Sequence, residues 1–111
     1  MSEIVVVASF TAHQGTEEAA EIFLADLLDT THAEDGCLLY ALHRGVEDPS
    51  RFVFVERWES RPLLDAHLNS AHIQTALSRV PEFFSNSDIV YYEAVPGGHS
   101  DKGSIAGHAR A

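Results

Sequence analysis

The hydrophobic and polar residues of this chain follow two different periods along its length. Residues 3–13 (EIVVVASFTAH) are rich in β-branched side chains and carry apolar residues in both alternating sets, which predicts a strand covered on both faces. Strands are also predicted at 37–45 and 51–59, where they flank the turn VEDPS to form a hairpin, and at 89–95. The polar stretch SNSD at 85–88 predicts a loop.

Two segments between these strands have the three- and four-residue spacing of amphipathic helices. Thr16 is placed to cap the first helix and Ser60 the second. The second helix continues past His72 until Pro81 disturbs it. The order strand, helix, strand, strand, helix, strand predicts an α+β fold, the ferredoxin-like βαββαβ arrangement with an antiparallel sheet and helices on one face.

A sheet of this kind leaves one face without helices, yet the predicted strands carry apolar residues on both faces. We therefore expect a second copy of the chain to bury the other face, which predicts a homodimer. The domain is expected to span residues 1–96. Residues 97–111 have little to bury, so they predict either a flexible C-terminal tail or an arm laid on the partner.

Composition narrows the class of protein further. A chain of 111 residues, 45% of them hydrophobic and 22% charged, is typical of one globular domain. Its 17 acidic against 7 basic residues give a formal net charge of -10, which disfavours nucleic acid and membrane surfaces as partners. No apolar run reaches the roughly 20 residues of a membrane span. The single cysteine, Cys37, agrees with a reducing compartment, and we expect a cytoplasmic protein.

Three motifs carry a resemblance to a known family. GCLLY, FVFVERWES and AHLNSAH, within a pattern that extends over residues 3–95, resemble the antibiotic biosynthesis monooxygenase family of dimeric α/β-barrel proteins, which includes quinol monooxygenases. The resemblance implies a cavity between the sheet and the helices. It also implies oxygenation without flavin or metal, so no cofactor is expected. Haem-degrading relatives have a tryptophan in the second helix, whereas the only tryptophan here, Trp58, lies on a predicted strand.

Cofactor-free oxygenation needs a group that removes a phenolic proton inside a dry pocket, and histidine suits this role near neutral pH. His67 lies on the apolar stripe of the second helix and is the favoured base, with a hydrogen-bonded core histidine as the alternative. His72, the second catalytic candidate, lies about 140° further round an ideal helix. The two histidines cannot share a metal ion unless the helix breaks between them, so no metal site is expected.

The other candidates for substrate binding lie on the predicted strands. Trp58 shares a strand face with Phe54 and Glu56, and its indole N–H could pair with Glu56, with Glu59 or with a ligand. A purely structural core tryptophan is the alternative.

Glu56 requires a partner if it is buried, for which Arg44, Arg51 or a residue of the partner subunit are candidates. Tyr40 could donate a hydrogen bond to a quinone oxygen. So could Tyr91 or Tyr92, but only one of these two can face a given cavity, because adjacent residues of a strand point to opposite sides.

These features predict a cofactor-independent monooxygenase that oxidises a small aromatic quinol or polyketide-like phenol with molecular oxygen. Two alternatives stay open. The chain could be an isomerase or lyase of a small carbonyl compound on the same fold, or a non-catalytic dimeric module that binds small molecules.

Overall fold

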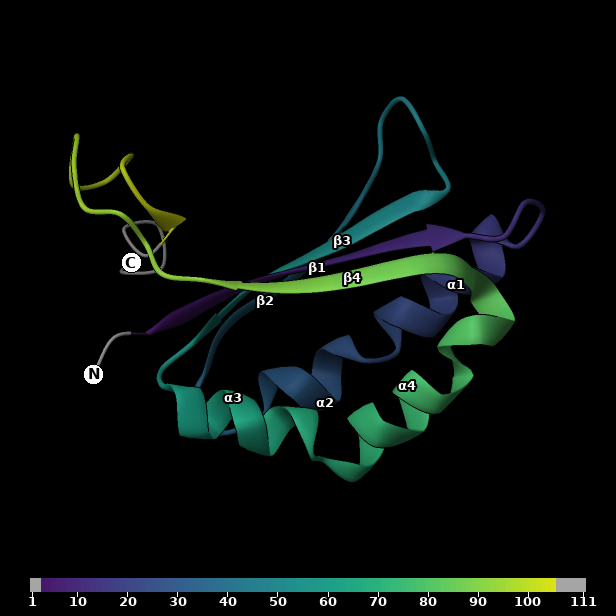
Figure 1. Ribbon diagram of the computed structural model, residues 1–111, viewed down its shortest axis with the longest axis horizontal. Helices are drawn as coiled ribbons and strands as arrows, with labels where there is room; N and C mark the ends of the chain where they lie inside the picture. The colour runs from purple at the N-terminus through teal and green to yellow at the C-terminus, as the bar shows by residue number, and fades with distance from the viewer. Residues whose placement is uncertain (1–2, 106–111) are drawn as a thin grey trace.

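The computed structural model describes residues 3–105, which form one antiparallel sheet with helices on one side. The strands are β1 (Ile4–Ala12), β2 (Cys37–Arg44), β3 (Arg51–Trp58) and β4 (Phe84–Tyr92), in the order β2-β3-β1-β4. The helices are α1 (Glu17–Ala25), α2 (Leu28–His32), α3 (Arg61–Leu68) and α4 (Ala71–Phe83). All of these helices lie on the same side of the sheet (Figure 1). The predicted ferredoxin-like α+β fold is confirmed.

The side of the sheet that faces the helices forms the hydrophobic core. β1 and β3 are paired so that Ala8 lies opposite Phe54 and Val6 lies opposite Glu56. Because side chains alternate along a strand, these residues share the helix-facing side. Tyr40 from β2 stacks on Phe54 with ring centroids 4.6 Å apart. The register therefore places one carboxyl group, that of Glu56, inside an aromatic and aliphatic layer.

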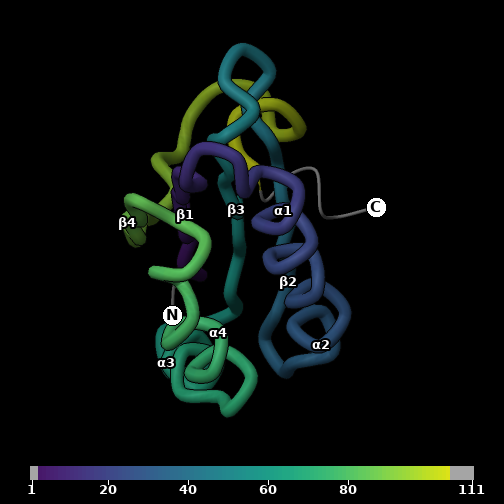
Figure 2. The backbone as a smooth tube through the Cα atoms, turned by 90° about the vertical axis from the view of Figure 1, so that its right-hand side faces the viewer, coloured from purple at the N-terminus to yellow at the C-terminus, as the bar shows by residue number. Residues whose placement is uncertain are grey.

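The helices divide this face between them. In the view of Figure 2, α1 and α2 lie next to β2, while α4 lies on the side of β4. The predicted first helix is two helices, because α1 ends at Ala25 and α2 starts at Leu28. Among the described residues, no helix is long and apolar enough to cross a membrane.

The predicted loop at 85–88 is wrong, because these residues belong to β4. β4 is an edge strand that pairs with β1 alone, and residues 85–88 are exposed. Polar side chains therefore carry no desolvation cost there, and a pattern based on hydrophobicity does not detect the strand. α4 also continues to Phe83, two residues beyond Pro81.

Only one of the two predicted helix caps forms a capping hydrogen bond. The hydroxyl of Ser60 accepts a hydrogen bond from the backbone N–H of Leu63 at 3.4 Å. Thr16 occupies the N-cap position of α1, as predicted, but its hydroxyl makes no capping hydrogen bond and donates instead to the carbonyl oxygens of His13 (2.7 Å) and Phe83 (3.2 Å). Thr16 thus links the end of β1 to the end of α4.

The four helices α1 to α4 leave the opposite side of the sheet uncovered. Val7 and Val55 lie opposite each other on the two central strands and face this side. Arg57, on the same side, donates two hydrogen bonds to Glu3, at 2.6 and 2.8 Å. Residues 93–105 lie on this side as well (Figure 1). Of the predicted tail, residues 106–111 fall outside the described part of the chain.

We expect Gly36→Ala to destabilise the fold by roughly 2 kcal/mol or more, for two reasons. Gly36 has a φ of +82°, and an added Cβ would lie 2.6 Å from the Cβ of Leu63. Gly15→Ala is the matched control, because Gly15 has a φ of +88° but no atom within 4 Å of an added Cβ. It should cost only about 1 kcal/mol. Urea unfolding measures both, and equal losses would contradict the predicted clash.

Candidate functional site

A break in the helical segment after β3 brings the two candidate histidines to the same place. α3 ends at Leu68 and α4 begins at Ala71. At the break, Ser70 donates to the carbonyl oxygen of His67 from its backbone N–H (3.1 Å) and from its hydroxyl (2.6 Å). The rings of His67 and His72 consequently lie 6.2 Å apart between centroids. The angle of about 140° that an unbroken helix would place between His67 and His72 therefore does not apply here.

A glutamate from a distant turn completes this group. Glu34 lies between α2 and β2, and its Oε1 is 2.6 Å from Nδ1 of His67 and 4.0 Å from Nε2 of His72. Nε2 of His72 also contacts the hydroxyl of Thr31 at 3.1 Å. His67 is only 4% exposed. A buried imidazole is therefore held in place by a carboxylate that the sequence analysis missed.

Aromatic side chains fix the ring of His67 from two sides. The Trp58 ring lies 4.5 Å away with a tilt of 32°, and the Tyr40 ring lies 5.6 Å away, edge to face. Nε1 of Trp58 donates to Oε1 of Glu56 at 2.9 Å, which confirms one of its predicted partners. Arg44 was another predicted partner of Glu56. This prediction is wrong, because Arg44 donates to Glu21 at 2.7 Å.

A mainly apolar cavity of about 50 Å³ lies between the sheet and the helices. Four of the predicted residues line it: Tyr40, Phe54, Glu56 and His67. Leu77 of α4 and Ile89 of β4 also line it, although they are 39% and 36% exposed. The cavity therefore reaches the surface between α4 and β4.

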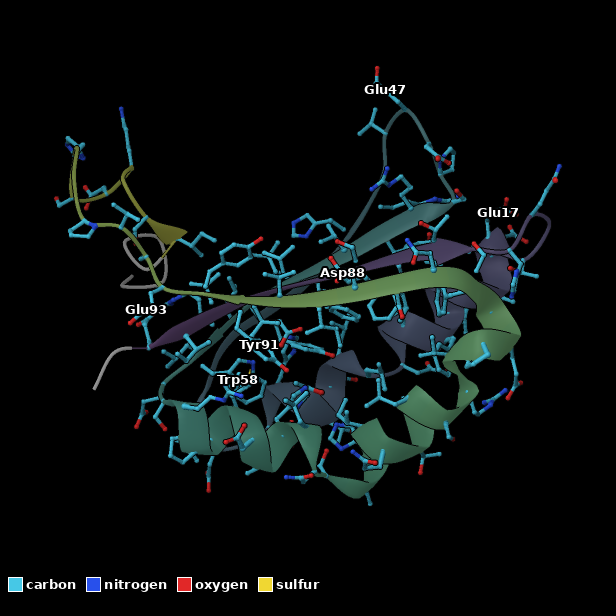
Figure 3. The ribbon with its side chains drawn as sticks, viewed as in Figure 1. Glu17, Glu47, Trp58, Asp88, Tyr91 and Glu93 are labelled. Carbon is cyan, nitrogen blue, oxygen red and sulfur yellow. The ribbon has the colours of Figure 1, made fainter. Side chains whose placement is uncertain are left out.

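The remaining predicted residues lie outside the cavity lining. Trp58 is fully buried against the ring of His67, and His72 lies next to Glu34, with Nε2 4.0 Å from Oε1. Trp58 and Tyr91 both lie on the helix side of the sheet (Figure 3). Tyr91, on the edge strand, is 39% exposed, and the Arg61 guanidinium lies 4.8 Å from the centre of its ring.

Burial perturbs the acid–base properties of the groups in this layer. It raises the pKa of Glu56 to about 7, while the hydrogen bond from Trp58 acts in the opposite direction. Burial lowers the pKa of His67, against the effect of the Glu34 carboxylate. The pKa of the Tyr40 phenol is raised by burial and by Glu56. Near neutral pH, Glu56 is thus close to its midpoint and burial favours neutral His67.

This geometry makes His67 suitable as a general base. Because the Glu34 carboxylate accepts a hydrogen bond at Nδ1, the imidazole proton is held there and the lone pair remains on Nε2. A fixed carboxylate also stabilises the imidazolium that forms after proton transfer. Cys37, by contrast, is unsuited to nucleophilic chemistry, since burial and the nearby Glu34 raise the pKa of its thiol to about 11.

Comparisons with known proteins identify the family. The sequence profile of the antibiotic biosynthesis monooxygenase family matches residues 3–79, and the chain belongs to this family. The Mycobacterium tuberculosis protein named "Putative monooxygenase Rv0793" is 32% identical over 84 residues, which cover 76% of this chain and 82% of that protein.

Solved structures share the fold. Protein SO0527 from Shewanella oneidensis matches with a TM-score of 0.81 at 32% identity, covering 83% of this chain and 90% of that chain. PA3566 from Pseudomonas aeruginosa matches with a TM-score of 0.80 at 31% identity, covering 86% and 97% respectively.

The raised pKa of Glu56 predicts a specific pH dependence of stability. Between about pH 4.5 and about 7 the folded state retains a proton that the unfolded state has lost, so the free energy of unfolding falls as pH rises. We expect this group to contribute roughly 1–3 kcal/mol of that fall. Glu56→Gln keeps an acceptor for Trp58 and removes the titration, so its free energy of unfolding should fall less.

Urea unfolding of both proteins at about pH 5 and about pH 7.5 measures the difference. The same pH dependence in the wild type and in Glu56→Gln would show that Glu56 does not titrate within this window.

Proposed function

We propose that this protein is a homodimeric, cofactor-independent monooxygenase that oxidises a small aromatic quinol or polyketide-like phenol with molecular oxygen. The observation that carries the proposal is the buried His67, which lines an apolar cavity and pairs with the partly exposed carboxylate of Glu34. The family and the name of the Mycobacterium tuberculosis relative support the reaction class.

In the proposed reaction, Nε2 of His67 accepts the phenolic proton of the substrate, and the Glu34 carboxylate stabilises the resulting imidazolium. The phenolate gives one electron to oxygen, and the two radicals combine at a ring carbon to form a peroxide. The imidazolium of His67 returns its proton to the peroxide. Loss of the proton on the peroxide-bearing ring carbon then breaks the O–O bond, which leaves one oxygen atom on the ring as a carbonyl and releases the other as water. The substrate supplies all four electrons, so no external reductant is consumed.

The cavity lining favours a flat, apolar substrate. Phe54 and Tyr40 present aromatic surfaces, while Glu56 and His67 are its ionisable groups. A cavity that takes up benzene measures about 150 Å³, whereas this one measures about 50 Å³. Substrate entry therefore requires the side chains at the surface opening, such as Leu77, to move apart.

We expect His67→Ala to lower oxygen uptake with a panel of hydroquinones by about 10²-fold or more, because the base is removed. Glu34→Gln should lower oxygen uptake less than His67→Ala does, because the amide oxygen can still accept the hydrogen bond from Nδ1. Some loss is still expected, since the amide carries no charge to stabilise the imidazolium. His13→Ala is the control and should match the wild type, because His13 is an exposed histidine outside the cavity lining.

An oxygen electrode measures the rates, and mass spectrometry after reaction in ¹⁸O₂ should find one labelled atom in the product. If the wild type and His67→Ala consume oxygen at the same background rate, His67 is not the base.

A proton-transferring isomerase is the second candidate, and one observation favours it. Glu56 and His67 both line the cavity, and burial raises the pKa of Glu56 to about 7 while it favours neutral His67. A protonated carboxyl group and a neutral imidazole in one cavity suit the movement of a proton on a carbonyl compound. Turnover under nitrogen would separate this reaction from oxygenation. A binding module with a filled interior is disfavoured by the cavity itself.

The homodimer is part of the proposal because the helix-free face of the sheet is apolar. Val5 and Val7 on β1, Val53 and Val55 on β3, and Val90 on β4 face this side. A second copy packed against this face would remove these side chains from water and join the two sheets in a dimeric α/β barrel.

We expect Val55→Lys to convert the dimer into a monomer, because it places a charge in the centre of this face. Ile22→Lys is the matched control: Ile22 lies on α1, is 63% exposed and faces away from the sheet interface, so the variant should remain dimeric. Sedimentation velocity measures the oligomeric state of the wild type and of both variants, all at the same protein concentration. A monomeric wild type, or a dimeric Val55→Lys, would contradict the proposed interface.

A further inference from the structure

Glu34, His67 and His72 form a cluster whose donor atoms resemble a metal-binding set. Each residue offers one ligand atom, and these atoms lie within 4.8 Å of one another. They come from three separate parts of the chain: the turn after α2, the last turn of α3 and the first turn of α4. The helix break brings the two imidazole rings to 6.2 Å from each other, and both rings lie near the Glu34 carboxylate.

The distances are close to those that a metal ion requires. A tetrahedral ion with bonds of about 2.0–2.1 Å separates its ligand atoms by about 3.4 Å. Oε1 of Glu34 is 2.6 Å from Nδ1 of His67 and 4.0 Å from Nε2 of His72. The first distance has to lengthen and the second to shorten, each by less than about 1 Å. The two histidine ligand atoms lie within 4.8 Å of each other, so their separation has to shorten by at most about 1.4 Å. We expect these changes to come from rotation of the Glu34 and His72 side chains, which are both partly exposed.

We propose that Glu34, His67 and His72 bind one divalent first-row transition metal ion, such as Zn²⁺ or Fe²⁺, beside the cavity. Two imidazole nitrogens and one carboxylate are the ligands that such borderline ions prefer, whereas Mg²⁺ and Ca²⁺ prefer oxygen ligands alone. This site goes beyond the proposed function, which requires no metal.

The surroundings of the cluster suit a site with an open coordination position. His67 is buried, whereas the side chains of Glu34 and His72 are 20% and 25% exposed, so an ion can enter from their side. The three protein ligands leave room for a water molecule as the fourth ligand. Nε2 of His72 has to exchange its contact with the Thr31 hydroxyl for the ion.

Binding of Zn²⁺ to the tag-free, full-length protein, stripped of metal with EDTA, tests the proposal. Isothermal titration calorimetry should find one tight site per chain in the wild type and no comparable site for Mg²⁺. Glu34→Gln and His72→Ala should each weaken the affinity for Zn²⁺ by at least about tenfold, since each removes a ligand. Circular dichroism checks that both variants are folded, and Glu34→Gln keeps a side-chain oxygen that can accept the hydrogen bond from Nδ1 of His67.

His43→Ala is the matched control, because His43 is an exposed histidine outside the cluster, and it should bind Zn²⁺ as the wild type does. The proposal is overturned if the wild type has no tight site. It is also overturned if Glu34→Gln and His72→Ala retain wild-type affinity, or if His43→Ala loses as much affinity as they do. Because the readout is binding, its outcome is independent of whether the protein oxygenates phenols.

Discussion

The layer between the sheet and the helices contains polar side chains that water hardly reaches, and each of them has to find its hydrogen-bond partner inside that layer. Within the described residues, no buried side-chain nitrogen or oxygen lacks such a partner. Trp58 donates to Glu56, and Glu34 pairs with His67. These pairs restrict how β2, β3 and α3 can pack, because an unpaired carboxyl or imidazole would cost several kcal/mol.

The same pairing decides which atoms remain available for chemistry. The Glu34 carboxylate occupies Nδ1 of His67, so only Nε2 is left to exchange a proton with a ligand. Trp58 occupies Oε1 of Glu56, whose pKa burial raises to about 7. A tryptophan that does not line the cavity thus positions two residues that do: it packs against the ring of His67 and bonds to the side chain of Glu56. The site therefore depends on Trp58, which acts on the cavity only through His67 and Glu56.

Local patterns were sufficient for the sheet and for the inward position of His67, because alternation and helical spacing are set by residues close in sequence. They did not identify Glu34, which lies in a turn 33 residues from His67 and becomes important only through tertiary packing. The polar start of β4 was missed because an edge strand can be hydrophilic. The sequence left a break between His67 and His72 open but did not locate it, because Ser70, the N-cap of α4, lies inside an apolar stripe and gives only a weak signal.

The two roles proposed for His67 exclude each other. A neutral imidazole that gives the lone pair of Nδ1 to a metal ion has to carry its proton on Nε2, and it then has no lone pair to accept a proton from a phenol. The Glu34 carboxylate likewise can bond to the ion or accept the hydrogen bond of Nδ1, since Oε1 serves both. Metal binding at this cluster would therefore convert His67 from a base into a hydrogen-bond donor, and would couple proton transfer in the cavity to the availability of the ion.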